Sequence, residues 1–325
     1  MARLPFFHAT IWTALAVLIS VSFFPTTTLA APPTVVASIK PIQALVKMVM
    51  GPIGTPDLIV PATASPHVFS LKPSQAKKLE QADVVFWIGP TLETTLEGPL
   101  DKLAKNARVI SLLNIPELSL INRTDTDGHE HTDDKAHNEA IDPHIWLSPT
   151  NAKVMLAHIE QTLIAVDPPN APEYAANAKK AKRRISILIN KTNKFTEHMH
   201  DKPYLVQHDG FGYLAQAFGF QEAGFIQTHP GREPGAKHIS QLIETIKARN
   251  VKCLFHEPQF TPKLAKRLGQ EHGLSLREID PMGTDLSLSD TTYVRIIQGI
   301  VLTMQSCLDP HLPGDGKEAH EQDPK

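Results

Sequence analysis

Four side chains that can bind a metal ion lie next to the ends of predicted secondary-structure elements. His208 and Asp280 each directly follow a predicted strand, while His67 lies in the loop after another strand. His144 lies just before a predicted helix. In open parallel sheets a ligand binds beyond the carboxyl ends of the strands, and a cleft between two lobes places two such edges face to face. We therefore expect these four side chains at the edge where a ligand in such a cleft would be met.

Three imidazoles and one carboxylate suit Zn²⁺, which accepts nitrogen and oxygen ligands in a tetrahedral shell. A proline precedes His67, another precedes His144, and a third follows Asp280. These prolines restrict the backbone, so the ligands would be held ready before the metal arrives. Any one of the histidines alone is more often a hydrogen-bonded or exposed side chain. Their shared placement favours a metal site formed by His67, His144, His208 and Asp280.

A polar segment at residues 121–140 precedes His144. It carries acidic residues together with three histidines, His129, His131 and His137. Such a segment cannot bury a core, so we predict a surface loop. Its imidazoles and carboxylates could collect metal weakly near the mouth of the cleft. The alternative is a solvated linker that contains a few histidines by chance.

Composition and missing motifs exclude several other chemistries. Sixteen histidines stand against two cysteines, which rules out cysteine-rich zinc scaffolds and iron–sulfur clusters. The net charge of −2 predicts no broad basic surface for nucleic acid, and the 6% aromatic content offers few side chains on which bases could stack. No phosphate-binding GxxxxGK[ST] loop is present, so the chain does not itself hydrolyse nucleotide through such a loop. His256-Glu257 does not begin a zincin helix, because the second histidine would fall at Phe260. We interpret this pair as structural, or as a partner behind the metal ligands.

The first thirty residues are typical of a secretory signal peptide. Arg3 is followed by no Lys, Arg, Asp or Glu until Lys40, and residues 9–24 form an apolar run that ends at Pro25. Small residues around Ala30 then suit a cleavage site. The alternative is an uncleaved membrane anchor. No cysteine lies near the cleavage region, so we expect no lipid attachment there.

The two cysteines, Cys253 and Cys307, would meet an oxidising compartment if the leader directs export. One disulfide within the chain is then the simplest outcome. The alternative is two buried thiols.

Short apolar runs alternate with amphipathic segments from residue 34 onward, which is the pattern of α/β proteins with mostly parallel sheets. The predicted strands lie at 34–39, 57–60, 84–88, 108–112, 204–207, 222–225, 251–255 and 276–279. Helices are predicted at 41–50, after 73–74, and at 149–166, 172–199, 211–218, 235–247, 261–272 and 290–307.

The long helix at 172–199 separates two such series, and its mixed basic and apolar faces suit one helix that lies against two bodies. We predict two Rossmann-like lobes, joined by this helix, with the metal site in the cleft between them. The predicted divisions are the signal peptide at 1–30, the N-terminal lobe at 31–168 with the polar segment, the linking helix at 169–200, the C-terminal lobe at 201–308 and a disordered tail at 309–325.

Several segments, in order, give the chain a resemblance to a known family. They are Val36-Ala37-Ser38-Ile39-Lys40-Pro41, Pro66-His67-Val68-Phe69-Ser70-Leu71-Lys72-Pro73-Ser74, Asp142-Pro143-His144-Ile145-Trp146-Leu147-Ser148-Pro149, His208-Asp209-Gly210-Phe211-Gly212-Tyr213, Glu233-Pro234-Gly235-Ala236-Lys237, Glu257-Pro258-Gln259-Phe260 and Asp280-Pro281-Met282-Gly283-Thr284. The chain resembles the periplasmic zinc-binding proteins of bacterial zinc-uptake ABC transporters, the ZnuA-like branch of the metal-binding cluster of solute-binding proteins.

This resemblance implies two α/β lobes joined by one long helix, with metal held by His67, His144 and His208. Family members selective for manganese or iron usually carry a glutamate in place of His208, so histidine favours zinc. The resemblance also implies a disulfide between Cys253 and Cys307 and a histidine-rich loop. Some zinc-binding members have a glutamate where this chain has Pro66, so here the fourth ligand would be Asp280 or water. The loop is also short, which weakens a collecting role.

The resulting hypothesis is a monomeric periplasmic protein that captures Zn²⁺ and delivers it to a membrane permease served by a separate ATPase. It predicts no enzymatic activity and no nucleic-acid partner. One alternative is the same role for Mn²⁺ or Fe²⁺. Others are a periplasmic zinc hydrolase with water at an open fourth position, and a surface adhesin.

Overall fold

The computed structural model describes residues 31–122, 141–227 and 233–310. Apart from Ala31, all of these residues belong to one compact unit that begins at Pro32. The first half of this unit contains a parallel sheet with the strand order β2-β1-β3-β4. Its strands are β1 (Val35–Ala37), β2 (Asp57–Leu58), β3 (Val84–Trp87) and β4 (Arg108–Ser111). The helices of this half are α1 (Lys40–Met50), α2 (Pro73–Glu80), α3 (Glu97–Leu103) and α4 (Pro149–Val166).

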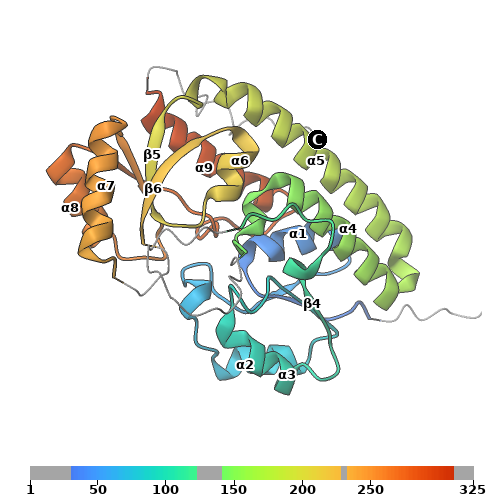
Figure 1. The fold of residues 1–325 in the computed structure, drawn as a ribbon. Coiled ribbons are helices and arrows are strands. Elements are labelled where there is room, and N and C mark those ends of the chain that lie inside the picture. The colour runs from blue at the N-terminus through green and yellow to red at the C-terminus, as the bar shows by residue number, and fades with distance from the viewer. Residues whose placement is uncertain (1–30, 123–140, 228–232, 311–325) are drawn as a thin grey trace, which may run out of the picture. The chain divides into compact units, whose positions relative to one another are not determined.

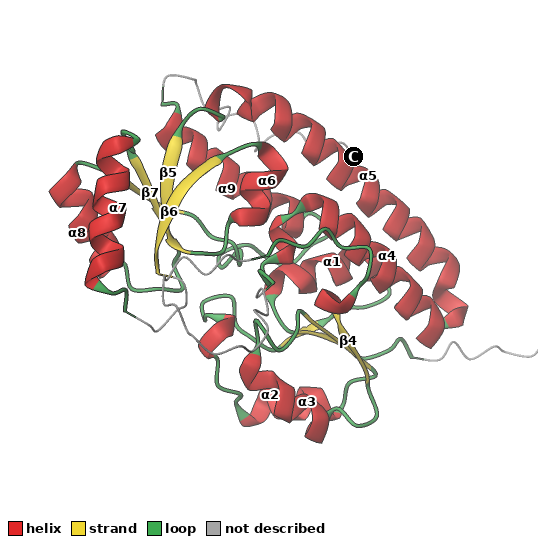
Figure 2. Cartoon of the chain, in the orientation of Figure 1, coloured by secondary structure: helices red, strands yellow, loops and turns green. Residues whose placement is uncertain are grey.

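The second half contains another parallel sheet, with the strand order β6-β5-β7-β8. Its strands are β5 (Pro203–His208), β6 (Gln221–Gln227), β7 (Cys253–His256) and β8 (Ser275–Glu278). The helices are α6 (Gly212–Phe218), α7 (Ala236–Ala248), α8 (Lys263–His272) and α9 (Thr292–Leu308). Figure 1 shows the two sheets in different parts of the molecule, and Figure 2 shows the helices around them.

The two halves repeat one topology, because in each sheet the first strand pairs with the second and the third. The inner strand β3 is buried at every position, as expected for a parallel strand covered on both faces. The predicted alternation of strands and helices and the two α/β lobes are confirmed. Several strands, such as β1 and β2, are shorter than predicted, whereas β5 and β6 are longer.

The long helix α5 (Ala171–Thr196) connects the two halves. Its buried side chains recur every three or four residues, at Tyr174, Ala178, Ala181, Ile185 and Leu188. This spacing places them on one face of the helix. That face packs on α1 and α4 from the first half and on α6 and α9 from the second, as Figure 1 shows for α4. The predicted long connecting helix is therefore confirmed.

One apolar core runs through both halves by way of α1, α4, α5 and α9. A smaller core fills the space between the second sheet and the helices α7 and α8. The halves are thus joined by shared packing as well as by a single helix.

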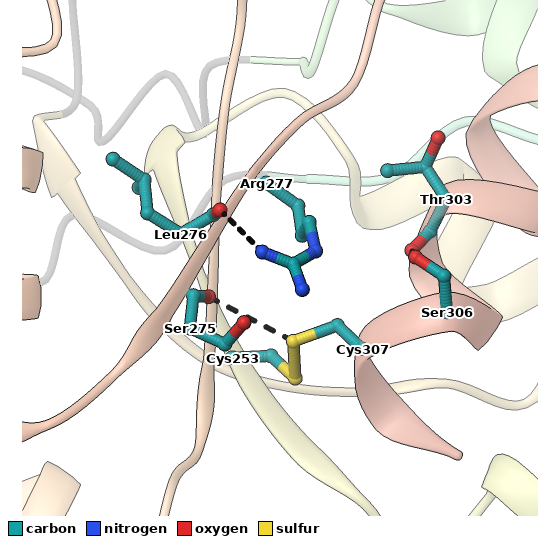
Figure 3. The surroundings of a disulfide bond; sticks show 7 residues. All are labelled: Cys253, Ser275, Leu276, Arg277, Thr303, Ser306 and Cys307. Carbon is teal, nitrogen blue, oxygen red and sulfur yellow. Dashed lines mark hydrogen bonds between the residues drawn. A yellow bond between two sulfur atoms is a disulfide. The ribbon is translucent and has the colours of Figure 1, made fainter. Parts of the chain in front are cut away.

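The predicted disulfide is present between Cys253 and Cys307. It ties the start of β7 to the last turn of α9, beside Ser275 and Arg277 (Figure 3). Closing a loop of this length stabilises the fold by at most about 4 kcal/mol in the chain-entropy model.

Some predictions fall on residues that the structure does not describe: the signal peptide at 1–30, the histidines His129, His131 and His137, and the tail from 311 onward. The predicted domain boundaries stay predictions. Within the described ranges, no helix combines the length and the apolar composition that crossing a membrane requires.

Candidate metal centre

Three of the four predicted ligands come together. The ligand nitrogens of His67, His144 and His208 all lie within 4.8 Å of one another. The Nε2 atoms of His67 and His144 are 3.3 Å apart. His67 and His144 are 77 positions apart in the sequence, and His144 and His208 are 64 positions apart. The fold thus brings three distant residues, from both halves of the chain, to one point.

His67 lies in a single 3-10 turn, Pro66–Val68, in the connection after β2. Pro66 fixes the first position of this turn, and the Ser65 hydroxyl accepts a hydrogen bond of 3.4 Å from the His67 backbone N–H. Proline and an N-capping serine are the residues expected at such a start. The local sequence therefore holds the His67 backbone in place.

His144 is buried and is held by Asp142. One carboxylate oxygen of Asp142 accepts hydrogen bonds from the His144 backbone N–H, at 3.0 Å, and from ring Nδ1, at 2.6 Å. A proton on Nδ1 leaves Nε2 unprotonated and turned toward His67. Tyr213 of α6 donates a hydrogen bond of 2.9 Å to the Asp142 carbonyl, which ties this loop to the second half.

His208 is the last residue of β5, at the carboxyl edge of the second sheet, and is 2% exposed. Neither ring nitrogen has a hydrogen-bond partner among the described residues. Buried polar atoms are nearly always satisfied, so an imidazole without hydrogen bonds beside two other imidazoles fits the role of a metal ligand. The buried Glu257, which follows β7, brings Oε1 to 3.4 Å from His208 Nδ1. A carboxylate therefore lies beside one nitrogen of each buried ring, and the other nitrogen is available to a metal.

The space between the three rings is small and mostly apolar. A cavity of about 20 Å³ is lined by the histidines together with Trp146, Phe211, Phe260, Pro281 and Met282, among others. Such a volume holds about one water molecule or ion. Gly210 lies against the rings, because a Cβ built on it would fall 2.9 Å from His208 Cε1 and 3.1 Å from His144 Nε2. The site thus has room for a single ion.

One pair of ring nitrogens has the spacing that a tetrahedral zinc ion requires. Two Zn–N bonds of about 2.0–2.1 Å at a tetrahedral angle separate their nitrogens by about 3.3–3.4 Å. This separation matches the distance between the Nε2 atoms of His67 and His144. The ligand set of neutral imidazoles with carboxylates behind them is also the usual environment of protein-bound zinc.

Asp280, the fourth predicted ligand, is not brought into the group of three histidines. Its carboxylate instead accepts backbone N–H bonds from Met282 and Gly283, each 3.0 Å long, and a short one from Thr284. The amide of Gln259 donates to it as well, at 3.1 Å. Both carboxylate oxygens of Asp280 therefore already have donors.

Sequence reasoning gave no role to Asp142 or Gly210, and it left Glu257 as structural or as a partner behind the ligands. The signal for Asp142 was available, since Asp-Pro-His places a carboxylate two residues before a ligand. Glu257 carries no such local signal, because its contact with His208 depends on the pairing of β5 with β7. Gly210 lies two residues beyond His208, but its approach to His144 depends on how the two halves meet.

A two-lobed α/β fold with buried histidines between its sheets defines a class of metal-binding protein, and the comparisons with known proteins give its family. The model of the family described as zinc-uptake complex component A, periplasmic, matches residues 35–307. The chain belongs to this family. The high-affinity zinc uptake system protein ZnuA of Brucella abortus (strain 2308) is 34% identical over 304 residues, which cover 84% of this chain and 91% of the relative. The protein of the same name from Haemophilus ducreyi is 32% identical over 288 residues, with 84% and 93% covered.

Solved structures show the same fold. A crystal structure of ZnuA matches with a TM-score of 0.71 at 24% identity and covers 84% of this chain and 99% of that one. The laminin-binding protein of Streptococcus agalactiae, described as having adhesin and metal-transporting activity, matches with a TM-score of 0.72 at 24% identity, with 85% and 99% covered.

Proposed function

We propose that this protein captures Zn²⁺ in the periplasm, with His67, His144 and His208 as ligands, and delivers it to an ABC-type zinc importer. The observation that carries the proposal is the meeting of three imidazoles at one point, where neither ring nitrogen of buried His208 makes a hydrogen bond to the described residues. Family membership supports the cargo and the role in uptake.

Water is the proposed fourth ligand. Asp280 stands outside the group of histidines, and its oxygens already accept hydrogen bonds. The pocket beside the rings is partly open to solvent, so a water molecule can complete a tetrahedral shell.

A zinc hydrolase is the alternative from another class, and it needs an open metal position that a substrate carbonyl can reach. Family membership favours the transport role over this alternative, because the family and the relatives are described as zinc-uptake proteins.

Delivery is proposed to occur at a membrane permease whose transport a separate ATPase drives. Residues 1–30 would direct export and be removed, and the mature protein would act as a monomer. Release would need only small movements of the lobes, because α5 and a shared core connect them.

The polar segment at 121–140 is proposed to collect metal for this site. Its ends support such a role: Asn122 and Ile141 form an antiparallel bridge, and the backbone N–H of Ile121 donates to the Tyr213 hydroxyl. The segment therefore starts and returns beside the loop that carries His144.

The test is a zinc titration of the mature protein, with competition between Zn²⁺ and Mn²⁺ on the wild type and on His208→Glu. We expect a single sub-micromolar zinc site in the wild type. In His208→Glu the preference should move toward Mn²⁺ by about tenfold or more, because carboxylate oxygen suits Mn²⁺ better than imidazole does. Absence of a sub-micromolar site would contradict the proposed function, and equal metal preference in both proteins would contradict the role of His208.

A further inference from the structure

We propose that Asp280 is a positioning residue rather than a metal ligand: it builds the turn by which the C-terminal half holds the N-terminal half closed over the metal. The inference rests on the proposed zinc site. We call residues 280–284 the cross-cleft turn.

The Asp280 carboxylate organises this turn from within. It accepts hydrogen bonds from the backbone N–H groups of Met282, Gly283 and Thr284, which lie two, three and four residues further along the chain. Gly283 has φ +65°, a left-handed conformation that glycine adopts without strain. Three amide donors on one carboxylate fix the path of the backbone, because hydrogen bonds to a charged acceptor are the strong ones.

The organised turn then bonds directly to the first half of the molecule. The Trp146 indole N–H donates to the Pro281 carbonyl at 3.1 Å. The Thr284 hydroxyl donates to the Ala62 carbonyl at 3.1 Å, and the Lys40 ammonium donates to the Thr284 carbonyl, also at 3.1 Å. The cross-cleft turn thus contacts three separate segments of the N-terminal half.

Gln259 adds a second connection through the same carboxylate. Its amide donates to the Ala62 carbonyl at 2.8 Å and to Asp280 at 3.1 Å. One carboxylate therefore positions both groups that reach Ala62, the Gln259 amide and, through the turn, the Thr284 hydroxyl.

Charge also draws the halves together at this point. Lys40, at the start of α1, is largely buried, and burial lowers the pKa of its amine while the charges of Asp280 and Asp285 oppose that shift. A cation from the first half thus faces carboxylates of the second half in a poorly hydrated position, where Coulomb attraction is stronger than in water.

These bonds lie next to the metal ligands. Trp146 is two residues beyond His144, and the two rings are 5.2 Å apart. Pro281 and Met282 line the cavity between the histidines, and Gln259 is two residues beyond Glu257. Loosening the cross-cleft turn would open the wall of the site without removing a ligand.

The key variant is Asp280→Asn, studied in the full mature protein. An asparagine side chain keeps one acceptor oxygen but replaces the other with an amide NH₂, which cannot accept the Thr284 N–H. We expect zinc to dissociate about tenfold faster or more, measured by stopped flow with a chelator in excess. The visible d–d spectrum of the Co²⁺-loaded variant should match that of the wild type, because the ligand set is unchanged.

Two outcomes would overturn the proposal. A changed d–d spectrum in Asp280→Asn would make Asp280 a ligand, and an unchanged zinc dissociation rate would deny it any role in closure. His208→Ala is the matched ligand control and should change the spectrum. Trp146→Phe keeps Asp280 and the ligands but removes the bond to Pro281, so its zinc dissociation should also be faster than in the wild type, by a smaller factor.

Hydrogen exchange in the metal-free protein tests this inference separately from the proposed function. It can be measured even if a variant binds metal poorly. In Asp280→Asn the amides of Gly283 and Thr284 should exchange at least tenfold faster than in the wild type. Protection equal to that of the wild type would contradict the positioning role whether or not the wild type binds zinc.

Discussion

At the scale of single residues, the proposed metal centre depends on close contacts between the histidine rings and their neighbours. Each buried imidazole has a carboxylate beside one of its nitrogens, Asp142 for His144 and Glu257 for His208. The hydrogen bond to Asp142 fixes the orientation of the His144 ring and raises its basicity as a ligand. Gly210 completes the arrangement by keeping its own position free of a side chain.

Gly210→Ala tests this close approach. The new methyl group would lie 2.9–3.1 Å from atoms of both His208 and His144, so at least one ring must move away from its place in the group. We expect zinc affinity to fall about 10- to 100-fold, the range typical of displaced support around a metal site. Competition with a chromogenic chelator measures the change.

Gly98→Ala, in α3, is the matched control, since a Cβ at that position meets no atom within 4 Å. Its zinc affinity should equal that of the wild type. Equal affinity in Gly210→Ala would mean that the rings do not need their present positions to bind the ion.

At the scale of elements, a buried carboxylate joins the ends of two strands in the first sheet. Glu93 is fully buried and accepts a short hydrogen bond from Ser38, directly after β1, and a bond of 2.9 Å from the Gly89 backbone N–H, in the loop after β3. Burial raises the pKa of the Glu93 carboxyl to about 7, against the hydrogen bonds that lower it. The loops at this sheet edge therefore depend on a group that titrates near neutral pH.

The sign of the resulting pH dependence follows from the raised pKa. Between about pH 4.5 and pH 7 the folded chain keeps a proton on Glu93 that the unfolded chain has lost, so the free energy of unfolding falls as pH rises through this window. The loss is of the order of 3 kcal/mol for a shift of this size.

Glu93→Gln removes this titration. Relative to the wild type, its free energy of unfolding should improve as pH rises from 4.5 to 7.5, as measured by urea denaturation of the metal-free protein. Glu97→Gln, on the exposed first turn of α3, is the control and should follow the wild-type curve. A constant difference between Glu93→Gln and the wild type across this range would contradict a buried, titrating Glu93.

At the scale of the whole molecule, the two halves share more than their connecting helix. The core through α1, α4, α5 and α9 is continuous, and the cross-cleft turn adds hydrogen bonds on the side of the metal site. Packed cores move between discrete arrangements rather than deforming gradually, so wide opening of the cleft would expose much apolar surface.

We therefore expect zinc to stabilise the protein strongly while changing its dimensions little. At zinc concentrations about a thousandfold above Kd the stabilisation should be about 4 kcal/mol, seen as a higher Tm. The radius of gyration from small-angle X-ray scattering should agree within about 1 Å between the metal-free and zinc-loaded protein, as small movements of packed segments require. An increase of several ångströms on metal removal would contradict the shared-core account.

Much of this protein was predictable from local pattern. The helix at 149–166 has the predicted bounds, because Ser148 caps it and Pro149 begins it, and both are local signals. The long connecting helix was predictable from its three-to-four-residue apolar spacing. Strand ends were less predictable, since they depend on pairing with neighbouring strands, and the local sequence does not specify that pairing.

The sequence by itself determined the alternating α/β pattern and the three histidines, because apolar periodicity and side chains at strand ends are local properties. A position after a strand suits Asp280 equally well as a ligand or as the organiser of a turn, and only the tertiary structure shows that its carboxylate accepts the backbone N–H groups of residues 282–284. The tertiary structure also decided that Glu257 and Gly210 lie against the rings. The contacts of Glu257 with His208 and of Gly210 with His144 join residues far apart in the sequence, and no local pattern records which hydrogen bonds a buried carboxylate will accept once the chain has folded.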